Sequence, residues 1–346
     1  MQFVGLDIHK KFTHAVVIDE QGNKILEERF DSSIQGLHKF LRKINKEASI
    51  VMEACYMWQH IYDYLEDGGY KVKLAHPLKT RAIAEARIKT DSIDAEILAQ
   101  LLRANLLPES YVPPRYVRTE REITRHRASL VRMRTRVKNK IHAILSKHGI
   151  RHGFSDLFGR SGIEFLRNLD LPMESRFQLN HYLTILRLLD YKIKETSYQI
   201  ERLVKDNPSA RLLTTIPGIS YYSALLIISE IGDIRRFQSS KKLCSYAGLI
   251  PSTYQSGNTL RHGKITKQGS KWLRWILIQS TNVAIRFNER LSKFYTRIAR
   301  KKGHNIAIVA TARKLLSYIY VMLTLGIEFN ALQVNRARAT RDFHGQ

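Results

Sequence analysis

Hydrophobic and polar positions follow two different periods along the first hundred residues. A short apolar run at 3–7 ends on Asp7, and 13–19 and 24–30 have the composition of two further strands around a Gly-containing turn at 20–23. Apolar residues then recur at helical spacing over 34–44, and strands at 49–53 and 70–75 enclose a helix over 57–65. A strand hairpin followed by alternating strands and helices predicts an α/β, ribonuclease-H-like domain over residues 1–110.

The helix expected after Thr90 carries an unusual pair of acids. Asp91 and Asp94 stand three residues apart, so they share one helical face with Leu98 and Leu101 further along. A buried carboxylate without a partner is costly, so two acids at the head of an apolar stripe suggest a divalent cation. A helix cap followed by a first-turn acid that the helix dipole favours explains the same residues without a metal.

Two further acids end predicted strands. Asp7 ends the first strand, and Glu53 ends the strand expected beside it in a mainly parallel sheet, where both can meet the Asp91 helix. Carboxylates from two strands and one helix suit two Mg²⁺ ions, which clamp the attacking and leaving oxygens of a phosphodiester. Each acid also has a structural alternative, a turn for Asp7 and a lysine partner for Glu53. For the nearby His9 we expect partial exposure and no catalytic role, with the orientation of a phosphate as the alternative.

Residues 115–151 predict a long basic helix with one apolar seam. Ile123, Leu130, Val137 and Ile144 are spaced by sevens, and the segment holds 12 Lys and Arg against two acids. This charge density suits a phosphate backbone, although a solvated helix face is the alternative. The candidate contacts are Arg125, Arg127, Arg132, Arg134, Arg136, Lys138 and Lys140.

A second seam predicts a long helical coiled-coil segment within residues 111–207. Its members alternate by fours and threes: Tyr182, Leu186, Leu189, Ile193, Thr196, Ile200 and Leu203. The seam can pack against the basic helix as a hairpin within one chain or pair two chains, and the pattern favours neither. Residues 149–174 contain Gly, Ser and Pro and are expected to form the connecting tip.

Residues 208–346 predict a mostly helical domain with two candidate nucleic-acid elements. Pro217-Gly218 between two short helices resembles a helix-hairpin-helix, although a plain turn in a core fits equally well. Ser256 precedes Gly257 in a polar loop, where a serine near cations can attack a phosphodiester, although Ser-Gly is usually a turn. Trp272 and Trp275, three apart on the following helix, are expected in the core, with base stacking as the alternative. The cations that follow the serine are Arg261, Lys264, Lys267 and Lys271.

Composition favours a polyanionic partner. The formal net charge is +26, from 57 Lys and Arg against 31 Asp and Glu, which points to nucleic acid. Cys55 and Cys244 lack metal-ligand spacing, so a disulfide framework and a zinc site are not expected. No signal peptide is recognisable, and the apolar stretch 306–329 is interrupted by Arg313 and Lys314, so we expect a cytoplasmic protein without a membrane partner.

Several motifs occur in one order along nearly the whole chain. They are Gly-Leu-Asp-Ile-His-Lys at 5–10, Met-Glu-Ala at 52–54, Lys-Thr-Asp-Ser-Ile-Asp-Ala at 89–95, Ile-Pro-Gly-Ile at 216–219, Tyr-Ala-Gly-Leu-Ile-Pro at 246–251 and Gln-Ser-Gly at 255–257. Together they resemble the DEDD-type insertion-sequence transposases, the family that includes the Piv invertase and the bridge-RNA-guided serine recombinases.

The resemblance implies roles for individual residues. It implies that a RuvC-like domain holds Mg²⁺ with Asp7, Glu53, Asp91 and Asp94, and that Ser256 of a C-terminal transposase domain forms a covalent phosphoserine link to DNA. It also implies a structured guide RNA that pairs with target and donor DNA. We therefore expect a recombinase that moves its own insertion sequence, acting as a dimer or tetramer on double-stranded donor and target DNA.

Two other functions remain open. A metal-dependent junction endonuclease would use water as the nucleophile and would cut DNA without a covalent adduct, leaving Ser256 as a turn residue. A non-catalytic nucleic-acid-binding protein would tolerate loss of the four acids.

Overall fold

The structure is a computed structural model that describes residues 1–83, 90–256 and 259–330, with side chains 255–260 and 262 outside the described part. The chain divides into two units, Met1–Pro113 and Pro114–Gln346. Each unit has its own apolar clusters. The mixed α/β unit followed by a mainly helical one agrees with the fold class expected from the sequence.

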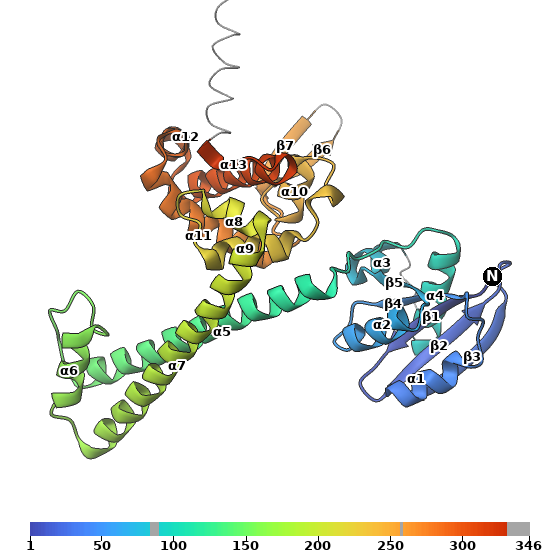
Figure 1. The fold of residues 1–346 in the computed structure, drawn as a ribbon, viewed down its shortest axis with the longest axis horizontal. Helices are drawn as coiled ribbons and strands as arrows, with labels where there is room; N and C mark the ends of the chain where they lie inside the picture. The colour runs from blue at the N-terminus through green and yellow to red at the C-terminus, as the bar shows by residue number, and fades with distance from the viewer. Residues whose placement is uncertain (84–89, 257–258, 331–346) are drawn as a thin grey trace, which may run out of the picture. The chain divides into compact units, whose positions relative to one another are not determined.

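A five-stranded sheet forms the centre of the N-terminal unit, in the order β3-β2-β1-β4-β5 (Figure 1). Strand β1 pairs antiparallel with β2 and parallel with β4, so the expected adjacency of the first and fourth strands is confirmed. The expectation of a mainly parallel sheet is wrong, because the hairpin makes β1-β2 and β2-β3 antiparallel while β1-β4 and β4-β5 are parallel. The elements are β1 (Phe3–Ile8), β2 (Phe12–Ile18), β3 (Lys24–Asp31), α1 (Ile34–Leu41), β4 (Ser49–Glu53), α2 (Trp58–Asp67), β5 (Lys71–Ala75), α3 (Pro77–Ile83) and α4 (Asp91–Arg103).

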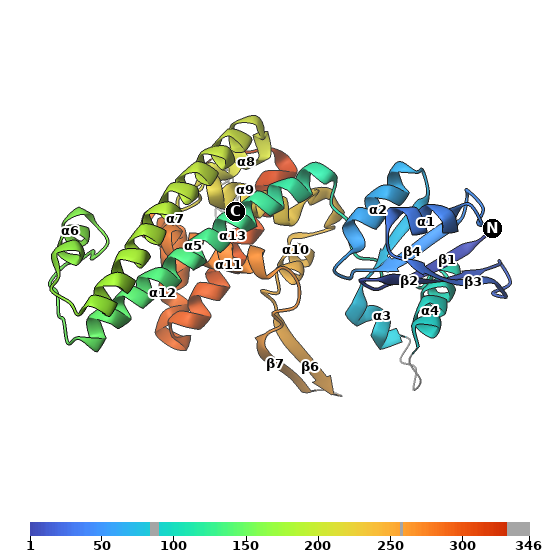
Figure 2. The same ribbon diagram turned by 90° about the horizontal axis from the view of Figure 1, so that it is seen from below.

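Helices cover both faces of this sheet (Figure 2). Helices α1 and α2 bury Phe40 and Leu65 against Leu6 and Met52 on one face. Helix α4 packs on the other face with small side chains, Ala95 and Ala99, beside Val16 and Ile18. A Cβ on Gly5 would lie 1.9 Å from the carbonyl oxygen of Ala95, so only glycine allows α4 to cross β1 this closely.

The C-terminal unit begins with a long helical hairpin. Helices α5 (Arg115–Lys147) and α7 (Met173–Asp206) pack against each other within the one chain (Figure 1). Leu203 was expected in the seam of α7, but it is 36% exposed, and the neighbouring Val204 is fully buried in its place. The connecting tip also contains a helix, α6 (Arg160–Asn168), whose Leu166 is buried with Leu157 and Leu179.

A second apolar core follows the hairpin. Every residue of α9 from Ser223 to Ile231 is buried, and α13 contributes Leu315, Leu316 and Ile319. Helix α13 is apolar enough to span a membrane by length and composition, but half of its most apolar window is buried inside the protein, which is typical of a core helix. The remaining elements are α8 (Pro208–Thr214), α9 (Tyr221–Ile231), a 3-10 helix (Ile234–Arg236), α10 (Ser240–Tyr246), β6 (Pro251–Ser256), β7 (Thr259–Ile265), α11 (Lys271–Phe287), α12 (Glu289–Lys302) and α13 (His304–Leu325).

The turn between α8 and α9, expected as a helix-hairpin-helix or a plain core turn, packs into the core. Gly218 has φ +89°, and a Cβ there would lie 2.7 Å from the carbonyl oxygen of Ser280 on α11. Ile216 and Ile219 on either side are buried. Glycine is required at this turn both by the backbone angle and by the close approach of α11.

Candidate active site

Three elements bring the predicted acids together in the N-terminal unit. Asp7 lies in β1, Glu53 is the last residue of β4, and Asp91 and Asp94 lie in the first turn of α4. Asp7, Glu53 and Asp94 line one cavity of about 290 Å³. Asp91 is connected to Asp7 through His9, whose Nε2 lies 2.9 Å from Asp7 Oδ2 and 3.2 Å from Asp91 Oδ1.

Strand pairing, a close helix–strand crossing and a helix cap explain why the acids lie together. Parallel pairing of β1 and β4 places the carboxyl ends of both strands, and hence Asp7 and Glu53, at the same edge of the sheet. The close crossing at Gly5 brings α4 down onto β1. The Thr90 side chain caps α4 by accepting a hydrogen bond from the Ile93 N–H at 3.3 Å, which fixes where the acidic first turn begins.

The acids repel one another in a partly buried setting. Burial raises the pKa of Asp7; the hydrogen bond and positive field of His9 oppose this, and the carboxylates of Asp91 and Asp94 raise the pKa further. Asp7, His9 and Asp91 each offer one ligand atom, and these atoms lie within 4.8 Å of one another. The arrangement can therefore accept a cation that offsets the negative charge.

Sequence reasoning gave His9 no catalytic role, yet His9 bridges two of the acids. A usable signal was present, because His9 follows Asp7 by two residues at the end of β1, and residues two apart along an extended segment point to the same side. Thr80 and Arg81 of α3 also line the acid cavity. They follow β5, whose carboxyl end lies at the same sheet edge as that of β4.

Ser256 belongs to a β-hairpin in the C-terminal unit. The sequence was expected to form a polar loop here, but β6 and β7 form an antiparallel two-stranded sheet in which Ser256 pairs with Thr259 (Figure 2). Ser256 is the last residue of β6, and its side chain lies outside the described part of the structure. Of the predicted cations, Arg261 and Lys264 lie in β7, Lys267 follows it, and Lys271 begins α11.

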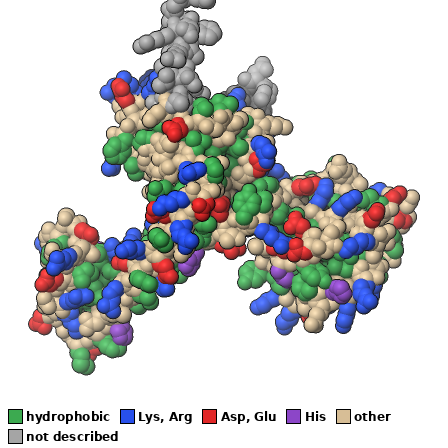
Figure 3. Space-filling view, viewed as in Figure 1, with side chains coloured by type: hydrophobic (Ala, Val, Ile, Leu, Met, Phe, Trp, Pro, Cys, Tyr) green, Lys and Arg blue, Asp and Glu red, His purple; other side chains and the backbone are tan. Residues whose placement is uncertain are grey.

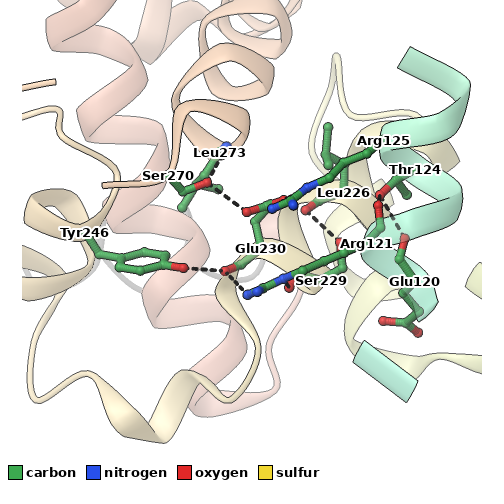
Figure 4. Close-up of polar contacts among 10 residues, drawn as sticks. All are labelled: Glu120, Arg121, Thr124, Arg125, Leu226, Ser229, Glu230, Tyr246, Ser270 and Leu273. Atoms are coloured by element: carbon green, nitrogen blue, oxygen red, sulfur yellow. Dashed lines mark hydrogen bonds and ion pairs between the residues drawn. The ribbon is translucent and has the colours of Figure 1, made fainter. Parts of the chain in front are cut away.

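A buried acid anchors the segment that follows this hairpin (Figure 4). The Glu230 side chain, only 2% exposed, accepts hydrogen bonds from Arg125 at 2.6 Å and from the Ser270 hydroxyl at 2.8 Å. The Ser270 N–H donates to the Tyr246 carbonyl at 2.9 Å, and the Tyr246 hydroxyl donates to the Glu230 carbonyl. These bonds fix the start of α11, where the hairpin ends, to α9 and α5. A lone acid in the apolar run of α9 was the sequence signal for such a buried pair.

The predicted nucleic-acid contacts of α5 fall into two groups. Arg125 bonds Glu230, Arg127 bonds the Ser197 hydroxyl at 2.7 Å, and Arg134 pairs with Asp190 at 3.2 Å. Arg132 and Lys138 lie over the rings of Trp272 and Phe158. By contrast, Arg136 and Lys140 are exposed and form no ion pair among the described residues. Figure 3 shows Lys and Arg side chains spread along the α5–α7 hairpin.

Positive charge is concentrated in one unit. Residues 1–113 hold 15 Lys and Arg against 16 Asp and Glu, whereas residues 114–346 hold 42 against 15. The acidic cluster thus belongs to a nearly neutral unit, and the excess of cations that suits a nucleic acid belongs to the other.

Known transposases match the chain along most of its length. A model of the DEDD transposases of IS110 matches residues 4–150, and a model described as the transposase IS116/IS110/IS902 family matches residues 210–296. The transposase of insertion sequence IS1328 from Yersinia enterocolitica is 29% identical over 94% of this chain and 98% of its own length. The IS1111A transposase of Coxiella burnetii is 26% identical over 94% and 90%, respectively.

A DNA-inverting protein is also similar. The pilin gene-inverting protein of Moraxella bovis is 29% identical over 77% of this chain and 76% of its own length. The two family models between them cover both the acidic cluster of the N-terminal unit and the β6–β7 hairpin of the C-terminal unit. Both family models and the transposase relatives that span most of the chain thus fit a DEDD-type IS110 transposase.

Proposed function

We propose that this transposase is a Mg²⁺-dependent DNA recombinase that uses Asp7, Glu53, Asp91 and Asp94 to hold metal and Ser256 to attack DNA. The observation that carries the proposal is the convergence of Asp7, Glu53 and Asp94 on one cavity, with Asp91 joined to Asp7 through His9.

The residues around the cavity fit Mg²⁺. Carboxylate oxygens are the ligands that Mg²⁺ prefers. The hydroxyl of Thr80, buried in the wall of the same cavity, has no hydrogen-bond partner among the described residues, so it is available to a water or an ion ligand. When bound, the metal would supply Lewis-acid stabilisation of the charge that develops on a phosphodiester.

The protein's own residues position and neutralise the substrate. The four acids hold the metal charge at the carboxyl edge of the sheet. His9, hydrogen bonded to Asp7, restrains that carboxylate, and the basic C-terminal unit neutralises phosphates and holds DNA. Arg136, Lys140, Arg261, Lys264, Lys267 and Lys271 are the candidate contacts to duplex DNA that we retain from the predicted set.

The serine step conserves the energy of the phosphodiester. The Ser256 hydroxyl oxygen forms a bond to phosphorus and loses its proton, while the bond from phosphorus to one deoxyribose oxygen breaks and that oxygen leaves with a proton. The reverse attack by a different deoxyribose hydroxyl releases the serine and joins the new strands. No high-energy cofactor is required, because one ester is exchanged for another.

Guidance by a structured RNA and assembly into an oligomer are also part of the proposal. The resemblance to bridge-RNA-guided recombinases supports the RNA, and the large positive charge of residues 114–346 is sufficient for both RNA and DNA.

The acid cluster is tested by removing one carboxylate. Asp94→Asn should abolish Mg²⁺-dependent strand cleavage while leaving DNA affinity nearly unchanged, because the amide cannot supply the negative charge that binds the metal. Glu96→Gln is the matched control, since Glu96 lies on the same helix but pairs with Lys24. Chelation of Mg²⁺ should abolish cleavage by the wild-type protein. Cleavage by Asp94→Asn at the wild-type rate would contradict the metal site.

The nucleophile is tested by looking for the covalent link. Wild-type protein with substrate and Mg²⁺ should yield a denaturant-resistant protein–DNA adduct, and Ser256→Ala should yield none. Ser252→Ala is the matched control in the same hairpin, where the Ser252 hydroxyl donates to the Lys264 carbonyl at 3.1 Å. If the wild-type protein cleaves without an adduct, a water-attacking endonuclease replaces the recombinase; an adduct formed by Ser256→Ala would assign the nucleophile to another residue.

A further inference from the structure

An open pocket lies between α5, α9 and α11 in the C-terminal unit, and neither the four acids nor Ser256 is among its lining residues. Its volume is about 360 Å³, within the ~300–1,000 Å³ typical of ligand pockets. Its aromatic wall comes from Tyr222, Trp272 and Trp275, and its basic rim from Arg127, Arg132 and Lys271. The proposed recombinase mechanism uses none of the three aromatic residues.

One of the aromatic residues of the pocket is exposed to solvent. Trp272 and Trp275 were both expected in the core, but Trp275 is 41% exposed, and its ring meets that of Trp272 edge to face at 6.1 Å. A large exposed indole beside an open cavity leaves apolar surface in water, which a flat apolar ligand would cover. The Tyr222 hydroxyl is buried in the pocket wall and has no hydrogen-bond acceptor among the described residues.

The charged side chains that line the pocket are all positive. Arg132 lies over the Trp272 ring at 4.7 Å, and Arg127 lies over the Tyr222 ring at 4.3 Å. None of the residues that line the pocket, all of them described, is an acid. A ligand that combines a flat ring with a negative group would satisfy both features, and an unpaired nucleotide has this combination.

We propose that this pocket binds an unpaired nucleobase of a single-stranded nucleic acid. The base stacks on Trp275, the Tyr222 hydroxyl donates a hydrogen bond to a ring nitrogen or carbonyl of the base, and Lys271 with the two arginines neutralises the adjoining phosphates. A duplex does not fill the pocket, because its bases are stacked on one another. The inference rests on the proposed function to the extent that a recombinase exposes single strands of DNA or carries RNA.

The test uses the full-length protein and short single-stranded oligonucleotides, one DNA and one RNA, each with a single 2-aminopurine. Stacking on an indole quenches 2-aminopurine fluorescence, and loss of one base–aromatic stack weakens binding by about five-fold to a hundred-fold. Trp275→Ala should lose the quenching and weaken binding in that range. Phe287→Ala is the matched control, because Phe287 is an exposed aromatic of the same helix outside the pocket.

The outcomes separate the ligand sources and the two proposals. An effect of Trp275→Ala on the RNA alone assigns an RNA base, and an effect on the DNA alone assigns a DNA base. If the wild-type and Trp275→Ala proteins show equal quenching and equal affinity with both the DNA and the RNA oligonucleotide, the proposed base-binding pocket is wrong. The binding assay is run without Mg²⁺, so a negative result there does not contradict metal-dependent cleavage. Conversely, absence of the covalent protein–DNA adduct does not contradict base stacking in the pocket.

Discussion

Gly5 is the residue on which the geometry of the acid cluster depends most directly. The backbone of α4 at Ala95 and Ala99 occupies the space that a side chain on residue 5 would need. The contact atoms are backbone atoms, which cannot rotate away as the end of a side chain can. The distance between Asp7 on β1 and the acids of α4 is therefore set by the absence of one methyl group.

Gly5→Ala should destabilise the N-terminal unit by about 1–3 kcal/mol, the usual cost of overpacking, and should reduce strand cleavage because α4 must move away from β1. The midpoint of denaturant unfolding measures the first effect. Gly153→Ala is the control, since a Cβ there meets nothing within 4 Å. An unchanged midpoint and full cleavage by Gly5→Ala would show that α4 shifts at no cost.

The positions of the acids could be read from the sequence, whereas the partners of several cations could not. Asp7 and Glu53 lie at or next to the ends of strands, and Asp91 and Asp94 lie in the first turn of a helix; hydrophobic patterning reveals such positions. Arg125 and Arg127 have the same local sequence character as Arg136, yet they bond Glu230 and Ser197. Those partners are 105 and 70 residues away, so local sequence gives no indication of them.

At the scale of elements, the α5–α7 hairpin presents its exposed cations on a rigid support. Arg136 and Lys140 lie one helical turn apart on α5 and are both exposed. Such a pair can follow a phosphate backbone without giving up contacts inside the protein.

Replacing Arg136 and Lys140 together with Gln should weaken nucleic-acid binding and flatten its logarithmic salt dependence by up to about two units, because each phosphate contact contributes about 0.9. Lys192→Gln with Lys205→Gln is the control of equal charge on α7, where both lysines pair with nearby glutamates. The salt dependence of the dissociation constant, measured for both double variants, shows whether the exposed cations of α5 contact phosphates. Equal slopes for both double variants would mean that only total charge matters.

The elements that sequence patterning missed lack a clear apolar period. Helix α6 is short and lies in a segment with turn-forming residues, and it is stabilised by distant side chains such as Leu179. The β6–β7 hairpin is a two-stranded sheet in which none of the described side chains is buried, so no alternation marks one face as buried. Strands β1, β2 and β4 of the N-terminal sheet bury most of their residues, and their patterns were accordingly clear.

At the scale of the whole molecule, the four acids proposed to bind metal and the excess of cations belong to different units. A protein of residues 114–346 should bind duplex DNA with a strong salt dependence, and a protein of residues 1–113 should bind it weakly, because it carries 15 cationic and 16 anionic side chains. Fluorescence anisotropy with a labelled duplex at two salt concentrations measures both. Comparable affinity of the two fragments would contradict the assignment of DNA binding to residues 114–346.

Because charge is divided in this way, the proposed strand cleavage depends on the effective concentration of the N-terminal unit near DNA that the basic unit has bound. A neutral unit that carries the acids has little attraction for DNA of its own, so it meets a strand chiefly when the basic unit of the same chain is already bound. Tethering then raises its local concentration to roughly millimolar, the range found for short links between modules. The proposed cutting centre is thereby restrained by connectivity, and breaks are confined to DNA that the rest of the chain has already selected.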